Sequence, residues 1–204
     1  VLDEGGRYTA EAAALNHLIA EKMFNSASRV PEGEKPHAVI MLGKPGSGKS
    51  SLIDRLGLRQ NYTILDADEA MKRLPGYQPE LASAYHQRGV DIIGQDLALR
   101  VIRERANAVF DITGRDPAKP EEFVRMLRSA GYGVEVIHAR VSTMKSVQRA
   151  HDRFLKGGRY IKIAGAFTGE GPTRSFDIIK NTADKWSEYD TSKKSPTKTS
   201  SGRR

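Results

Sequence analysis

Eight consecutive residues have the composition of a phosphate-binding loop. They are Gly43, Lys44, Pro45, Gly46, Ser47, Gly48, Lys49 and Ser50. The run satisfies the pattern G-x-x-x-x-G-K-[ST], in which backbone N–H groups wrap the β-phosphate, the lysine neutralises phosphate oxygens and the last hydroxyl ligates Mg²⁺. The apolar stretch HAVIML precedes it and SLIDRLG follows, which gives the strand-to-helix context that the motif needs. We call residues 43–50 the phosphate loop and predict that it binds ATP with Mg²⁺.

Two aspartates end the next predicted strand. Asp66 and Asp68 stand in ILDADEA, after a strand expected over residues 62–66. Open α/β sheets bind ligands at the carboxyl ends of their strands, so one of these carboxylates can face a substrate. A kinase uses such a group to orient a hydroxyl and accept its proton. Asp66 and Asp68 could equally well cap the helix expected over ADEAMKR. Their spacing alone therefore does not decide between a catalytic and a capping role.

A third acid and a polar turn belong to the following strand. Asp111 lies inside the apolar run NAVFDIT, where a carboxylate needs a partner. Lys49 would provide one, as would a Mg²⁺ ion reached through water. Thr113 and Arg115 follow in FDITGR and are candidates to hold phosphate or hydroxyl groups of a substrate. A structural ion pair with an ordinary turn is the alternative.

Arginines follow one another on a later helix, expected over residues 143–156. Arg149 and Arg153 are one turn apart, opposite the apolar residues, so we expect them to point away from the core. Arg159 follows in a Gly-Gly-Arg break, as a short lid over transferring phosphate would need. Arg153 and Arg159 are thus candidates to clamp phosphate groups, with solvated surface arginines as the alternative.

Strand and helix patterns alternate along the chain. The expected strands cover residues 37–42, 62–66, 107–113, 134–141 and 186–190. The expected helices cover residues 10–24, 50–56, 91–105, 120–130 and 143–156. This alternation predicts an α/β fold with a parallel sheet of about five strands flanked by helices.

Composition and charge restrict the classes of function. The 204 residues contain no cysteine, which excludes disulfides and thiolate chemistry, and no apolar run approaches a bilayer-spanning length. The net charge of +8 suggests a nucleic-acid partner, but the acid-free stretch TSKKSPTKTSSGRR at the C-terminus carries much of it. We therefore interpret residues 1–191 as one domain and residues 192–204 as a basic, disordered tail, and do not expect nucleic-acid or membrane binding.

The ordered set of motifs resembles the zeta toxin family of P-loop kinases. The set consists of GKPGSGKSSL, ILDADEAMKRLPGYQP, FDITGR, RFLKGGRYI and ADKWSEYDTS, and it covers roughly residues 10–191. The resemblance implies a shikimate- or adenylate-kinase-like core. It also implies transfer of the γ-phosphate of ATP or GTP to UDP-N-acetylglucosamine, toxic action in a bacterial or host cytosol, and a protein antitoxin that blocks the nucleotide site.

By position, the resemblance also implies roles for single residues. Lys49 and Ser50 match the pair that binds phosphate and Mg²⁺. Asp68, rather than its neighbour two residues earlier, matches the base that activates the sugar hydroxyl, and Thr113 matches a substrate contact. Arg153 and its partner in the Gly-Gly-Arg break match the two arginines that surround the phosphates.

The sequence departs from the family on the acceptor side. The acidic substrate ligand expected before the third strand falls at Gln95 or Asp96, of which we take Asp96, and the family's glutamate before the T-G-R turn is Asp111. The lid segment, residues 157–173, is short and rich in glycine. The acceptor therefore stays open. An NAD-type dinucleotide, a polynucleotide 5′-hydroxyl and a non-catalytic nucleotide-binding module are the alternatives to a UDP-N-acetylsugar.

Overall fold

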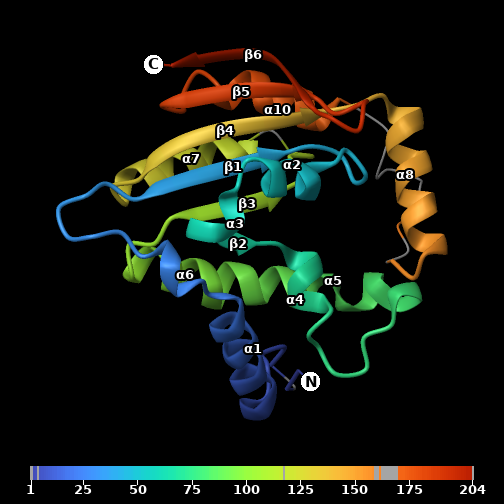
Figure 1. Cartoon of the computed structure of the whole chain (residues 1–204). Coiled ribbons are helices and arrows are strands. Elements are labelled where there is room, and N and C mark those ends of the chain that lie inside the picture. Colours follow the sequence, from blue (N-terminus) through green and yellow to red (C-terminus); the bar gives the residue numbers. More distant parts are fainter. Residues whose placement is uncertain (1, 4, 117, 159–160, 162–169, 204) are drawn as a thin grey trace.

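A six-stranded sheet runs through the centre of the protein (Figure 1). The computed structural model describes residues 2–3, 5–116, 118–158, 161 and 170–203. The strands are β1 (His37–Leu42), β2 (Thr63–Leu65), β3 (Ala108–Ile112), β4 (Gly133–Arg140), β5 (Lys185–Asp190) and β6 (Thr197–Arg203). Their order in the sheet is β2-β3-β1-β4-β5-β6, and every neighbouring pair is parallel except β5 with β6. The strand that precedes the phosphate loop, β1, is therefore an inner strand.

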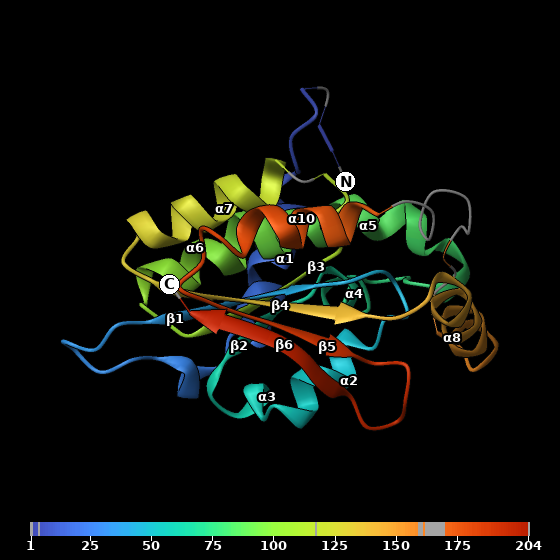
Figure 2. The ribbon, with the colours of Figure 1, turned by 90° about the horizontal axis from the view of Figure 1, so that it is seen from above.

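Helices cover both faces of this sheet (Figure 2). The α-helices are α1 (Ala10–Met23), α2 (Lys49–Arg55), α3 (Leu58–Asn61), α4 (Ala67–Met71), α5 (Ala82–Asp91), α6 (Ala98–Arg103), α7 (Ala118–Ser129), α8 (Thr143–Leu155) and α10 (Gly171–Ile179). Short 3₁₀ turns form η1 (Ser26–Ser28) and η2 (Pro79–Leu81), and η3 (Ile92–Leu97) is π-helical. In Figure 2, α7 and α10 lie over one face of the sheet and α2 and α3 over the other, while α8 lies beyond the carboxyl end of β4.

Side chains of β1 alternate between two cores. Ala38, Ile40 and Leu42 belong to a core that includes residues of α1, α7 and α10, whereas Val39 and Met41 pack with α2. A parallel sheet covered on both faces needs strands that are apolar along their whole length. This explains the continuous apolar run before the phosphate loop and confirms the predicted α/β class.

Two helical regions differ from the sequence expectation. The helix expected over residues 91–105 is the end of a longer helical stretch that begins with α5 and passes through the π-helical η3 into α6. Helix α10 was not among the expected helices. Its Phe176 and Ile179 are buried in the core of the sheet face that α7 also covers. This short helix is stabilised by its packing on the sheet, which the local sequence pattern does not show.

The C-terminal segment forms a strand up to Arg203, which corrects the disorder expected for the basic tail that begins at residue 192. Thr197–Arg203 forms β6, which pairs antiparallel with β5, from Lys185 opposite Arg203 to Asp190 opposite Thr197. Most β6 side chains are exposed, so the composition argument about apolar burial was sound. The edge of β5 nevertheless offers backbone hydrogen bonds, and Gly202 lies against the indole of Trp186. Pairing at a sheet edge therefore orders a segment that has no core of its own.

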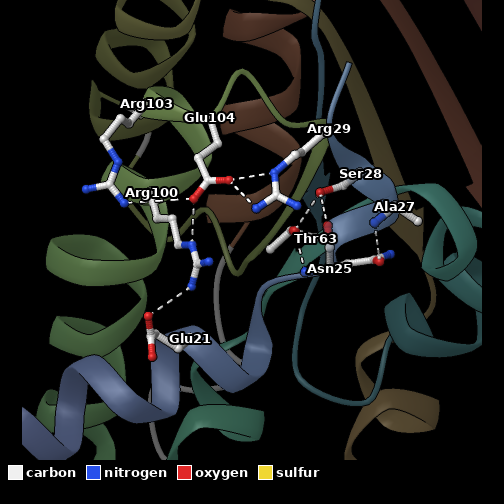
Figure 3. Close-up of polar contacts among 9 residues, drawn as sticks. All are labelled: Glu21, Asn25, Ala27, Ser28, Arg29, Thr63, Arg100, Arg103 and Glu104. Carbon is white, nitrogen blue, oxygen red and sulfur yellow. Dashed lines mark hydrogen bonds and ion pairs between the residues drawn. The ribbon is translucent and has the colours of Figure 1, made fainter. Parts of the chain in front are cut away.

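A polar network ties α1 to the end of α6 (Figure 3). Glu104 accepts hydrogen bonds from Nε of Arg29 at 2.6 Å and from Nε of Arg100 at 3.0 Å. Arg100 also lies 3.6 Å from a carboxylate oxygen of Glu21 on α1, and both arginines lie over the ring of Phe24. Burial acts against the charge, but the arginine hydrogen bonds outweigh it and hold the pKa of Glu104 below its usual value. The network holds α1 on the outside of the helical layer.

Candidate nucleotide site

The phosphate loop connects β1 to α2 through a backbone that requires glycine. Gly46 (φ 76°) and Gly48 (φ 86°) both adopt the left-handed conformation that side chains disfavour. A Cβ on Gly46 would lie 2.3 Å from the carbonyl oxygen of Ser146, so this glycine also permits close contact with α8. Loops of this kind aim successive N–H groups at an anion.

Buried polar groups of the loop fit a bound phosphate. Lys49 is buried, and its ammonium donates to the carbonyl oxygens of Gly43 at 2.7 Å and of Lys44 at 3.4 Å. The hydroxyl oxygen of Ser47 is buried without a hydrogen-bond partner among the described residues. A buried hydroxyl normally has a partner, so its lack of one points to a group that the loop is built to receive. Nucleotide phosphates supply oxygens suited to both groups.

Lys49 also forms an ion pair with the strand carboxylate. Its Nζ lies 3.4 Å from Oδ1 of Asp111, and the two side chains are 10% and 11% exposed. The register of the sheet produces this contact, because β3 lies beside β1 and places Asp111 opposite Met41. Of the two partners expected for Asp111, the structure therefore provides the lysine. So little exposure leaves their attraction weakly screened by water.

Oxygen donors for Mg²⁺ surround the same edge. Ser50 is exposed at the start of α2, and Asp111 and Asp66 supply carboxylates. Hydroxyl and carboxylate oxygens suit Mg²⁺, which commonly keeps several waters and takes few direct protein ligands. Within the described ranges, no three His, Asp or Glu side chains form a ready-made metal cage. The residues thus fit an ion shared with nucleotide phosphates, and the roles of Ser50 and Asp111 towards it remain predictions.

The two aspartates after β2 have different structural roles. Asp66 caps α4, because its Oδ1 accepts the N–H of Asp68 at 2.8 Å. Burial, together with the negative charges of Asp111 and Asp68, raises the pKa of Asp66 to about 7. Asp68 is half-buried in the first turn of α4. The capping role left open by the sequence therefore belongs to Asp66, and the role of Asp68 as base remains a prediction.

The orientation expected for α8 is wrong. Ser146 and Ala150 are its buried residues, whereas the apolar Met144 and Leu155 are 83% and 69% exposed. Arg149, expected to point away from the core, donates to the carbonyl oxygen of Thr191 at 2.7 Å. The phosphate loop approaches α8 so closely that only small side chains fit between them. Helical periodicity gave two faces but not which one is inward.

The two proposed clamp arginines are only partly located. Arg153 is exposed in the last turn of α8. Arg159 lies outside the described residues, as does most of the expected lid. The clamp that these residues were predicted to form therefore remains a prediction.

The candidate substrate residues fall into two places. Thr113 is half-buried and Arg115 exposed just after β3, in a turn fixed by a hydrogen bond from the Ser175 hydroxyl to the carbonyl of Gly114, at 2.6 Å. Asp96 instead lies 3.7 Å from Nδ1 of His17 on α1. The structure thus brings Thr113 and Arg115 to the carboxyl edge of the sheet, whereas the contact described for Asp96 is with α1.

A cavity of about 640 Å³ lies elsewhere, between the N-terminal segment and α5. Its lining includes Tyr8, Arg88 and Asp91, and the Tyr8 hydroxyl donates to Asp91 at 2.7 Å. Among the predicted site residues that the structure describes, Gln95, the alternative to Asp96, lines this cavity and the others do not. The phosphate loop and this cavity are therefore separate features.

Two buried residues that donate hydrogen bonds to carbonyls of the phosphate loop were missed from the sequence. Ser146 of α8 donates to the carbonyl of Pro45, and the Thr191 hydroxyl donates to the carbonyl of Ser47. Thr191 directly follows β5, so the rule that ligand-site residues lie at the carboxyl ends of strands would have selected it. For Ser146, nothing in the sequence pattern indicated an inward position.

The fold resembles those of several solved structures. The PezAT toxin–antitoxin system of Streptococcus pneumoniae matches with a TM-score of 0.65 and 19% identity, over 90% of this chain and 78% of that one. The AvrRxo1-ORF1:-ORF2 structure with ATP matches with a TM-score of 0.73 and 12% identity, over 97% and 69%. The Pnkp1/Rnl/Hen1 RNA repair complex matches with a TM-score of 0.55 and 18% identity, over 74% and 47%. At such identities the likeness concerns the fold.

The fold and the phosphate loop together define a P-loop protein. The family model for Zeta toxin matches residues 21–168, so the chain belongs to the Zeta toxin family. Among curated proteins, none matches the chain by sequence. Every helix in the described part of the chain is too short or too polar to cross a membrane.

Proposed function

We propose that this protein is a kinase that transfers the γ-phosphate of ATP or GTP, with Mg²⁺, to a hydroxyl of a small nucleotide-type substrate. The observation that carries the proposal is the buried ion pair between Lys49 of the phosphate loop and Asp111 of β3, beside two further aspartates at the carboxyl edge of the sheet. Membership of the Zeta toxin family supports a UDP-N-acetylsugar as the acceptor and toxicity as the outcome.

The residues divide the work of phosphoryl transfer. The loop amides and Lys49 would bind the phosphates, and the lysine would exchange its carbonyl partners for phosphate oxygens. Mg²⁺, held by Ser50 and through water by Asp111, would neutralise charge on those oxygens. Asp68 would orient the acceptor hydroxyl and take its proton, since it lies in the first turn of α4, just after β2. Arg153 would stabilise charge on the transferred group.

Phosphate transfer from labelled ATP tests the assignment. A panel of sugar nucleotides, NAD-type dinucleotides and oligonucleotides is incubated with the protein and Mg²⁺, and the labelled product is identified. Lys49→Ala and Asp68→Ala should each reduce transfer at least a hundredfold, because phosphate stabilisation and base catalysis each contribute about that much. Asp54→Ala, an exposed aspartate paired with Arg59, is the matched control and should keep wild-type activity. Full activity in Asp68→Ala would remove it as the base.

A polynucleotide kinase is the second candidate. The fold is similar to a structure of an RNA repair complex, and β6 holds the basic C-terminal segment along the sheet edge. If oligonucleotides alone are labelled, this candidate replaces the first. Binding of ATP without labelling of any acceptor would instead favour a nucleotide-binding regulatory module.

We further propose a protein antitoxin that covers the nucleotide site. The PezAT structure, to which the fold is similar, is that of a toxin–antitoxin system. The proposal would be supported by a small protein, encoded by a neighbouring gene or co-expressed, that forms a stable complex with this chain. Its binding should raise the apparent Kd for ATP. A complex that leaves ATP affinity unchanged would place it at a different surface.

A further inference from the structure

Two hydroxyl groups from outside the phosphate loop hold two of its carbonyl oxygens. Oγ of Ser146, on α8, donates to the carbonyl of Pro45. Oγ1 of Thr191, just after β5, lies 2.6 Å from the carbonyl oxygen of Ser47 and 2.9 Å from that of Arg140. Ser146 is fully buried and Thr191 is 2% exposed. Both contacts therefore operate without competition from water.

Each contact fixes the direction of a neighbouring N–H group. A trans peptide unit is planar, so the carbonyl of one residue and the N–H of the next point in opposite directions. The chain has no cis peptide bond among its described residues. Turning the Pro45 carbonyl towards Ser146 therefore turns the Gly46 N–H away from α8. In the same way, the bond from Thr191 to Ser47 turns the Gly48 N–H away from β5.

The two glycines also lie against the elements that carry the hydroxyls. A Cβ on Gly46 would contact the backbone of Ser146, and a Cβ on Gly48 would lie 3.5 Å from Cβ of Thr191. Arg149 secures the second hydroxyl, because its guanidinium donates to the carbonyls of Thr191 at 2.7 Å and of Ser192 at 3.2 Å. The loop is thus held from two sides, by α8 and by the turn that joins β5 to β6.

We propose that Ser146 and Thr191 are positioning residues that aim the N–H groups of Gly46 and Gly48 at a nucleotide phosphate. This inference rests on the donor half of the proposed function, the binding of ATP, and not on the identity of the acceptor. The turn that joins β5 to β6 thereby has a role in nucleotide binding, since Thr191 and its partner Arg149 connect that turn to the phosphate loop.

Calorimetric titration of the full chain with ATP and Mg²⁺ tests the proposal. Thr191→Val and Ser146→Ala remove one hydroxyl each and should each weaken ATP binding about tenfold, because each frees one peptide unit of the loop to rotate. Thr191→Ser keeps the hydroxyl and should bind ATP like the wild type. Ser28→Ala is the control, because Ser28 is also fully buried and donates to a backbone carbonyl, that of Asn25, away from the loop.

Amide resonances give a readout that a general loss of stability would not produce. In wild-type protein, ATP should shift the N–H signals of Gly46 and Gly48. Thr191→Val should diminish chiefly the Gly48 shift, and Ser146→Ala chiefly the Gly46 shift. If Thr191→Val does not fold, the pairing of Ser146→Ala with Gly46 still decides the matter.

Three results with the variants would overturn the inference alone. The first is unchanged ATP affinity in both hydroxyl-deleting variants, and the second is an equal loss in Ser28→Ala. The third is equal weakening of both glycine shifts by either variant. Failure of the wild type to bind ATP would overturn the donor half of the proposed function together with this inference. ATP binding without transfer to any acceptor would affect only the proposed kinase activity.

Discussion

Replacing Gly46 by Ala should destabilise the protein more than its backbone conformation alone explains. The left-handed φ of 76° costs an alanine about 1–2 kcal/mol. The added Cβ would also lie 2.3 Å from the carbonyl oxygen of Ser146, a backbone atom that cannot rotate away. Forcing α8 and the loop apart in a packed region costs about 1–3 kcal/mol more. We therefore expect a total loss of about 2–5 kcal/mol.

Gly131→Ala separates the two contributions. Gly131 has a similar φ of 87°, but a Cβ there would meet nothing within 4 Å. This variant should lose only the conformational part, about 1–2 kcal/mol, and should bind ATP normally. Urea unfolding, followed by the fluorescence of the single tryptophan, Trp186, measures both free energies. Equal losses in the two variants would refute the argument that α8 packs this tightly on the loop.

Three further predictions follow from the structure. The folded-state pKa of Asp66, about 7, lies above the ordinary value of 3.8, so the folded protein holds this proton more tightly than the unfolded chain. The associated stability should be present below about pH 4 and disappear as pH rises to about 7, and unfolding titrations of Asp66→Asn should lack this dependence. Glu104→Gln should lower the free energy of unfolding by about 1 kcal/mol at neutral pH, because it weakens the hydrogen bonds from Arg29 and Arg100. The loss should be smaller in high salt, which screens these charges, and a loss independent of salt would contradict this explanation. Removing residues 192–204 should lower the free energy of unfolding by about 1–4 kcal/mol, because the cross-strand pairs between β5 and β6 are lost. The fluorescence emission of Trp186 should also shift to the red. An unchanged melting temperature would show that β6 does not stabilise the fold.

The phosphate loop and the class of fold could be predicted from the amino-acid sequence alone. A motif such as residues 43–50 is local, because its glycines, lysine and serine are adjacent in the chain and act through their own backbone. The five predicted strands could also be recognised locally, since β1 is apolar from Ala38 to Leu42 and a helical pattern separates each predicted strand from the next. Asp111 could be recognised as needing a partner because a charge inside an apolar run is rare.

The partner of each side chain depends on the tertiary structure. Lys49 forms an ion pair with Asp111 because β3 lies beside β1. The order of strands in the sheet cannot be predicted from the residue spacing in either segment. The inward face of α8 depends on how closely the phosphate loop approaches it, which periodicity does not measure. The C-terminal strand β6 exists because β5 leaves an edge to pair with, although its own composition predicted disorder. In each case the deciding energy comes from contacts between segments far apart in the chain, so the separate segments could not reveal it.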